Sequence, residues 1–213
     1  MSYGLVIRNQ AGAVVVDSDY RHTVFYDKYT PGITDTHYYN IKVRLGNMYD
    51  LGYLAYNNFP VPGYLYWFRM QPNTFSFPGA WMYQPGVEII RTSREKPIQK
   101  GYLNVYNGSG SLVWSDISSY DMPRIRGFIS PTLDIDNNIQ SIRPGFNPWI
   151  LMNNCPGNLT EDDLFTGYSG MFFRWNGADL QYTWEQKAGR TFNSVFGGVA
   201  SLNIPYAFFN YGR

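Results

Sequence analysis

Short apolar segments interrupted by glycine and proline constrain the fold of this chain more than any other feature. The 213 residues include 21 Gly and 13 Pro, a density that excludes long helices over most of the sequence. Runs of Val, Ile, Thr and Tyr recur between turn-forming residues at intervals of about eight to twelve residues, as in sandwiches and barrels. The sequence therefore predicts an all-β fold, either a β-sandwich or related antiparallel sheets.

Helical signals are confined to two short segments. Thr160 could cap a single turn within 158–165, because the residues that follow it are acidic. A second short turn is expected at 185–188. Neither segment is long enough to change the fold class.

Composition and charge limit the classes of function that the chain can have. Hydrophobic residues make up 44% of the chain and charged residues 15%, a balance that favours folding over disorder. The net charge is +1, so the sequence lacks the basic footprint of a nucleic-acid binder.

We expect no membrane insertion, because no apolar run approaches the roughly 18 residues of a spanning helix. The N-terminus lacks the features of a secretory signal, which favours synthesis in a cytoplasm.

An internal repeat is the most informative pattern. At a constant offset of 98 residues, Leu5 corresponds to Leu103, Asn9 to Asn107 and Gly12 to Gly110. Each copy reads as a strand, a tight Asn-x-x-Gly turn and a second strand, since Asn initiates turns and Gly supplies the positive φ that closes them.

The repeat has two explanations. Two ordinary hairpins could share common turn chemistry. Alternatively, the chain could hold two related β modules, 1–95 and 96–213, with the basic stretch Arg91–Lys100 near the boundary. We favour the second, because the match extends over both arms of the hairpin, but a single continuous domain remains an alternative.

The beginning of the chain resembles an uncharacterised family of tailed-bacteriophage tail proteins. The resemblance rests on Ser2-Tyr3-Gly4-Leu5, the Asn-x-x-Gly turn and the Asp17-Ser18 step, and the second copy of the repeat follows the same pattern. It covers about thirty residues in the two copies. The resemblance implies a virion protein of the tail tip, fibre or receptor-binding apparatus, and it supplies no catalytic residues.

The residues that could support catalysis do not form a recognisable pattern. A Cys–His pair would need Cys155 beside His22 or His37, and a zinc site would need both histidines with a carboxylate. Among the four glutamates, Glu88 and Glu185 could flank a glycosidic bond, but nothing singles them out. We therefore expect no catalytic residues, no metal and no cofactor, and keep a glycan-cleaving enzyme as the least favoured alternative.

The segment 134–138 begins like a calcium loop. Asp134, Asp136 and Asn138 place oxygens at alternating positions, but the Gly and Glu expected at positions six and twelve are replaced by Ile139 and Gly145. A polar turn between strands is the simpler interpretation.

Aromatic residues reach 18% of the chain and are especially dense from Tyr38 to Tyr83. Such rings can stack on sugars, but they serve subunit packing at least equally well. Polar and apolar residues alternate too little in the run 64–70 for a strand with one exposed face. The run therefore predicts a strand covered on both faces. The apolar stretch 201–213 predicts a docked final strand. The residues we expect at an interface or ligand surface are Tyr64, Tyr66, Trp67, Trp81, Tyr83, Phe208, Phe209 and Tyr211.

Together these patterns predict a contact-making protein. We expect a structural component of a phage tail, located in the virion, that binds other tail proteins as a homo-oligomer, with a trimer favoured. Attachment to a host-surface glycan or protein is a further expected role. The main alternative is a carbohydrate-binding β module.

Overall fold

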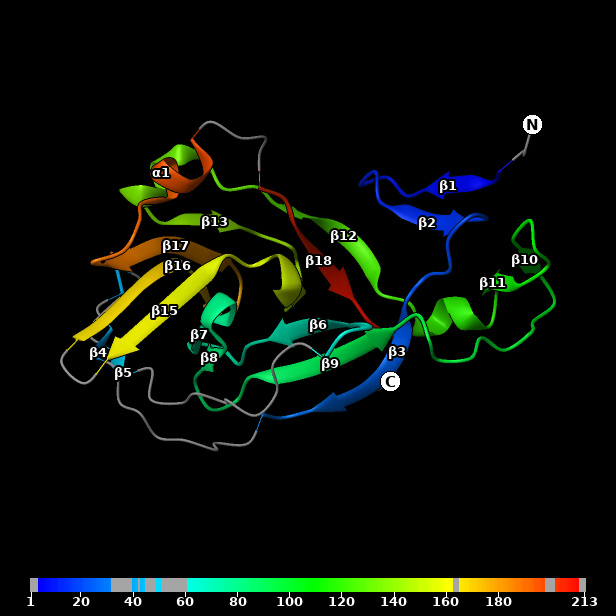
Figure 1. Ribbon diagram of the computed structural model, residues 1–213, viewed down its shortest axis with the longest axis horizontal. Helices are drawn as coiled ribbons and strands as arrows, with labels where there is room; N and C mark the ends of the chain where they lie inside the picture. The colour runs from blue at the N-terminus through cyan, green and yellow to red at the C-terminus, as the bar shows by residue number, and fades with distance from the viewer. Residues whose placement is uncertain are drawn as a thin grey trace.

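The chain folds into two large antiparallel β-sheets with small hairpins at one end, as the computed structural model in Figure 1 shows. The all-β prediction is confirmed. The structure describes residues 4–31, 40–41, 43–44, 49–50, 61–162, 165–197 and 202–210.

Sheet I has six strands in the order β12-β18-β14-β6-β9-β3. Their bounds are β3 (Val24–Tyr29), β6 (Tyr64–Arg69), β9 (Glu88–Ser93), β12 (Arg124–Ile129), β14 (Trp149–Leu151) and β18 (Ile204–Phe208). The final strand β18 pairs with both β12 and β14. The prediction of a docked C-terminal strand is thus confirmed, and its partner is the sheet of its own chain.

Sheet II packs against sheet I. Its order is β13-β17-β16-β7-β8, and β15 pairs with β16 beside this path. The bounds are β7 (Phe75–Phe77), β8 (Met82–Tyr83), β13 (Gln140–Ile142), β15 (Gly157–Asp162), β16 (Phe165–Trp175) and β17 (Leu180–Lys187). The remaining elements are three two-stranded sheets and short helices: β1 (Val6–Arg8), β2 (Val14–Asp17), β4 (Asn40–Ile41), β5 (Tyr49–Asp50), β10 (Asn104–Tyr106), β11 (Leu112–Ser115), η1 (Pro78–Ala80), η2 (Ser118–Asp121), η3 (Leu133–Asp136), η4 (Met152–Asn154) and α1 (Phe192–Phe196).

The main core lies between the two sheets. Phe68 of β6 meets Phe173 of β16 edge to face, with ring centroids 5.7 Å apart, and Ile150 and Met171 are buried in the same cluster. The opposite face of β6 is also covered, because Trp67 is buried and donates from Nε1 to Thr92 Oγ1 at 3.2 Å. A strand buried on both faces cannot alternate polar and apolar residues, which confirms the prediction for the run 64–70.

The predicted division into modules 1–95 and 96–213 does not describe this fold. Sheet I takes β3, β6 and β9 from the first half and β12, β14 and β18 from the second, and sheet II also mixes both halves. Neither large sheet therefore belongs to one of the two predicted modules alone.

Sheet I nevertheless repeats itself on either side of the β6–β14 contact. In each half, the first strand in the chain lies at the edge, the second at the centre and the third between them. Both edge strands have an irregular register at corresponding positions, between Phe25 and Asp27 in β3 and between Ile125 and Gly127 in β12. Two related units that share one sheet account for this order and for the repeat in the sequence.

The two predicted helical turns are wrong. Thr160 lies in β15, where it is paired with Gly167 of β16, and residues 185–187 continue β17. Ladder pairing with a long neighbouring strand outweighs the weak local preference for a cap. The helix that does form, α1, starts after Thr191, whose side chain accepts a bond from Ser194 N.

A matched pair of isoleucines tests the shared core. Ile150 is fully buried opposite Phe68, whereas Ile139 is 44% exposed. We expect Ile150→Ala to lower the free energy of unfolding by about 2–5 kcal/mol, and Ile139→Ala to change it by less than about 0.5 kcal/mol. Urea unfolding followed by circular dichroism and by tryptophan fluorescence should give one coincident transition. Equal effects of the two variants would contradict this description of the core.

Candidate functional site

The two hairpins of the sequence repeat have the same geometry. In one, β1 pairs with β2 so that Ile7 lies opposite Val16, and in the other, β10 pairs with β11 so that Val105 lies opposite Trp114. Each ladder shifts its register directly after this pair. Every matched position differs by the offset of 98 that the sequence shows, so the predicted hairpins are confirmed.

The turn asparagines make equivalent bonds. Ala13 N donates to Asn9 Oδ1 at 3.0 Å, and Ser111 N donates to Asn107 Oδ1 at 2.8 Å. The backbone repeats the match, because Asn9 N donates to Ala13 O and Asn107 N to Ser111 O, both at 2.9 Å. These bonds fix each turn from within.

The turn glycines are also equivalent. Gly12 and Gly110 both have φ of +79° and both donate to the carbonyl of the turn asparagine at 2.9 Å. No other atom lies within 4 Å of the position where a Cβ would be. Backbone conformation alone therefore demands glycine at these turns.

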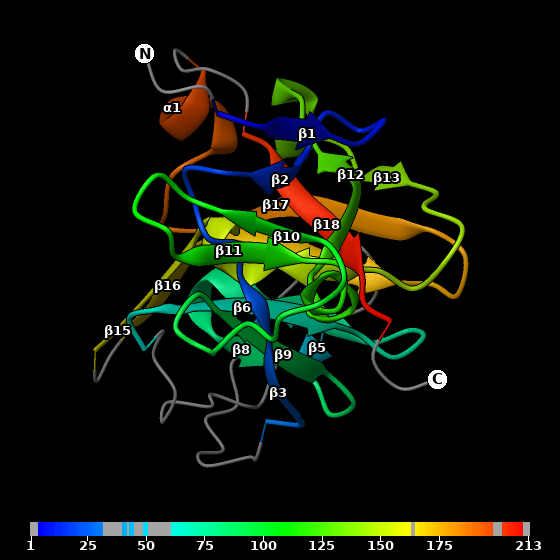
Figure 2. The ribbon, with the colours of Figure 1, turned by 90° about the vertical axis from the view of Figure 1, so that its right-hand side faces the viewer.

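Each hairpin precedes an edge strand of sheet I, β3 in one case and, after the short helix η2, β12 in the other. The hairpins meet at one end of the molecule, where β2 contacts β11 (Figure 2). Asn9 Nδ2 donates to Ile125 O of β12 at 2.7 Å. This bond ties the first hairpin to the edge strand that follows the second hairpin.

The two hairpins bury different positions of the shared motif. Val16 is 4% exposed in the first hairpin and Val113 is 2% exposed in the second. These positions do not correspond, because Val16 matches Trp114, and Val113 matches Val15, which is 41% exposed. The same motif is therefore packed differently in its two settings.

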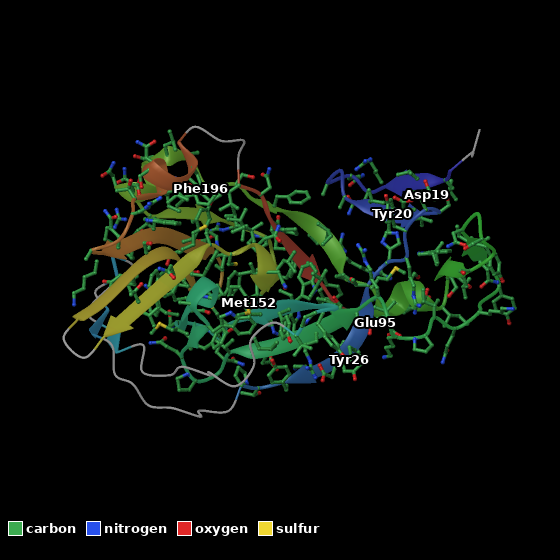
Figure 3. The ribbon with its side chains drawn as sticks, in the orientation of Figure 1. Asp19, Tyr20, Tyr26, Glu95, Met152 and Phe196 are labelled. Atoms are coloured by element: carbon green, nitrogen blue, oxygen red, sulfur yellow. The ribbon has the colours of Figure 1, made fainter. Side chains whose placement is uncertain are left out.

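Apolar side chains remain exposed on both hairpins. In Figure 3 the neighbouring Asp19 and Tyr20 lie at this end, far from Met152 in the core between the sheets. The large exposed hydrophobic residues of the hairpins and their flanks are Leu5, Val6, Ile7, Val15, Tyr20, Tyr102, Leu103 and Tyr106. An exposed cluster of this kind is typical of a contact surface. We call this end of the molecule the twin-hairpin surface.

Of the aromatic residues expected at an interface, four are buried inside the chain, and the expectation is corrected for these four alone. The buried ones are Tyr66, Trp67, Tyr83 and Phe209, and the partly buried ones are Tyr64, Trp81 and Phe208. Tyr211 lies outside the described residues. Phe209 packs edge to face on Trp67 and Trp149, at 5.6 and 5.9 Å between ring centroids. The buried rings stabilise the two sheets, so in this chain they present no surface to a sugar or a partner.

Partly exposed rings gather at one edge of sheet I instead. Tyr26, labelled in Figure 3, meets Tyr64 edge to face at 4.9 Å. The Arg91 guanidinium lies 5.1 Å from the Tyr64 ring and pairs with Asp27. Burial raises the pKa of the nearby Tyr29 phenol to about 12, which keeps that phenol in its neutral form.

The two glutamates considered for glycan cleavage lie on different sheets, each with its own cations. Glu88 of β9 pairs with Lys28 and Arg69. Burial by itself raises the pKa of the Glu88 carboxyl, but the hydrogen bonds from Lys28 and Arg69 outweigh it and hold the pKa below its usual range. A proton donor needs a raised pKa, so Glu88 does not fit that role.

Glu185 of β17 shares a small polar hollow with Asp136 and Arg44. The backbone and side chain of Arg44 both donate to Glu185 Oε1, at 2.9 and 3.3 Å. The Asp136 carboxylate accepts from Phe192 N at 2.7 Å and Asn193 N at 2.8 Å. Asp136, a residue of the calcium-like segment, thereby caps α1. Both carboxylates are engaged in holding the fold together.

Of the remaining reactive candidates, Cys155 lies in the described part of the chain. Burial raises the pKa of the Cys155 thiol well above its ordinary value, which disfavours the reactive thiolate. His37 lies outside the described residues. Within the ranges that the structure describes, no three His, Cys, Asp or Glu side chains come together to hold a metal ion. No described helix has the length and apolar character needed to cross a bilayer.

These features define a two-sheet, all-β protein that carries a duplicated hairpin at one end. The chain belongs to the family described as "Domain of unknown function (DUF8377)", whose sequence model matches residues 1–211. No curated protein and no solved structure matches the chain.

The duplication provides a matched test of how the first hairpin is attached. Asn9→Ala removes the bonds to Ala13 N and to Ile125 O, whereas Asn107→Ala removes only bonds within its own turn, to Ser109 and Ser111. We expect Asn9→Ala to cost about 1–3 kcal/mol, because it leaves a part-buried carbonyl without its partner. Hydrogen exchange should accelerate throughout β1 and β2 in this variant. In Asn107→Ala the acceleration should be limited to the second turn, and equal acceleration in both hairpins would contradict the attachment through Asn9.

Proposed function

We propose that the protein is a structural component of a bacteriophage tail and that it makes its contacts through the twin-hairpin surface. The observation that carries the proposal is the pair of equivalent hairpins with exposed apolar side chains at one end of the molecule. The N-terminal resemblance to tail proteins lies in this same motif and supports the same conclusion.

The hairpins are suited to docking for two physical reasons. Each of these sheets has only two strands, so each hairpin leaves backbone N–H and C=O groups outside any ladder. An added strand can pair with such an edge, and exposed apolar side chains beside the edge then add burial. All three residues of β1 are exposed, which makes this strand the most accessible template.

Repetition of the motif favours contact with repeated partners. A tail contains many copies of its proteins, and homo-oligomers meet through recurring surfaces. Two versions of one hairpin, packed differently as Val16 and Val113 show, can engage two equivalent neighbours from one chain. The buried aromatic cluster gives no separate support to a carbohydrate-binding module.

A sedimentation experiment tests this function directly. The tagged chain would be expressed during phage growth, and particles would be purified from the lysate. We expect the wild-type chain to co-sediment with tails, and a double variant, Val6→Lys with Leu103→Lys, to remain largely free, because buried lysines oppose docking.

The control places the same charges at the hairpin turns. Gln10→Lys with Ser109→Lys changes exposed polar residues and should co-sediment like the wild type. A wild-type chain found only in the soluble fraction would contradict the tail assignment. Normal incorporation of the Val6→Lys and Leu103→Lys variant would contradict the role of the hairpins.

A further inference from the structure

A cavity of about 510 Å³ lies between the hairpins and the outer face of sheet I. Its walls come from the first hairpin, β11, the segment that joins η2 to β12, and the strands β6 and β14. The volume lies within the range of roughly 300–1,000 Å³ that small-molecule sites occupy. It is distinct from the exposed strand edges that the proposed function uses.

Most of the cavity wall is apolar. Leu65 and Trp67 line it from β6, Leu151 from β14, Ile125 from β12 and Val15 from β2. Such a wall favours the apolar body of a ligand, because burial of that body removes hydrocarbon surface from water. A sugar or a nucleotide would leave most of its polar groups without partners against this wall.

Two polar atoms of the lining residues are buried without a hydrogen-bond partner. They are Trp114 Nε1 and His22 Nε2. An indole N–H can only donate, so Trp114 requires an acceptor. Buried polar atoms without a partner are uncommon in native structures, and here two of them belong to residues of one cavity.

The charged side chains that line the cavity are both positive. Arg124 and Arg126 contribute guanidinium groups, and the described residues that line the cavity include no Asp or Glu. Arg124 is bonded to the amide oxygen of Asn210, which leaves its positive charge uncompensated. Burial lowers the pKa of His22, an effect that Asp17 partly opposes and that Arg94 reinforces, so a positive charge on the imidazole is disfavoured. An acceptor group with one negative charge fits this arrangement.

We propose that this cavity binds a small amphipathic monocarboxylate, a molecule of the medium-chain fatty acid type. The chain lies against the walls of sheet I, and the carboxylate lies in the field of Arg124 and Arg126. Trp114 Nε1, which is buried in the unliganded chain, turns toward the carboxylate and donates to it. The ligand occupies the inner side of the hairpins and not the strand edges used for docking, although Val15 belongs to both the cavity wall and the twin-hairpin surface.

Titration calorimetry of the full chain with decanoate tests the proposal. We expect saturable binding of one decanoate per chain, with decan-1-ol and decyltrimethylammonium bound at least about tenfold more weakly, since each lacks the negative charge. Decanoate that binds no better than the alcohol or the cation, or that does not bind at all, would overturn the proposal and leave a water-filled space.

Variants locate the site. Trp114→Phe keeps the ring but removes the N–H donor, and it should weaken decanoate binding about tenfold, as loss of a hydrogen bond to a charged group does. Trp81→Phe is the matched control outside the cavity and should bind like the wild type. Arg126→Gln alters an exposed residue, and it should weaken binding severalfold. Wild-type affinity in both Trp114→Phe and Arg126→Gln would place the ligand elsewhere and overturn the assignment.

Discussion

The antiparallel contact between β6 and β14 holds the two halves of sheet I together. Only two residue pairs form its ladder, Phe68 with Ile150 and Trp67 with Leu151. Phe68 and Ile150 face sheet II, while Trp67 and Leu151 belong to the cluster on the other face, which Phe209 covers. Burial on both faces compensates for the shortness of the ladder, since each large apolar side chain contributes about 1.5–3 kcal/mol when fully buried.

This contact also determines where the hairpins are presented. Three strands from each half extend outward from it and end in the edge strands β3 and β12, each preceded by a hairpin. Because the halves share one sheet, the hairpins belong to one body and meet at one end, where Asn9 bonds to the opposite unit at Ile125. A fold with two independent modules would leave their relative positions undefined. The shared sheet therefore makes a combined contact surface and the cavity beneath it possible.

The residues within each turn were sufficient to predict the hairpins from the sequence. They were not sufficient to predict how the hairpins are arranged in the fold. Asn9, Gly12 and their counterparts 98 residues later specify their turns by bonds within the turn, so the repeat could be predicted. The sharing of one sheet depends on pairing between strands distant in sequence, which no local pattern encodes. The same limit explains Thr160, whose weak helix signal is overridden by β16, and Asp136, whose capping of α1 joins segments 56 residues apart. The cavity likewise combines residues from both halves.

Separation of the halves tests the shared sheet most directly. Residues 1–95 and 96–213 would be produced as two chains and studied by circular dichroism and urea unfolding, alone and mixed. Each half alone lacks the partner of β6 or β14, so we expect no cooperative unfolding transition from either, and recovery of a single transition in an equimolar mixture. Two halves that each unfold cooperatively on their own, with no change on mixing, would contradict the account.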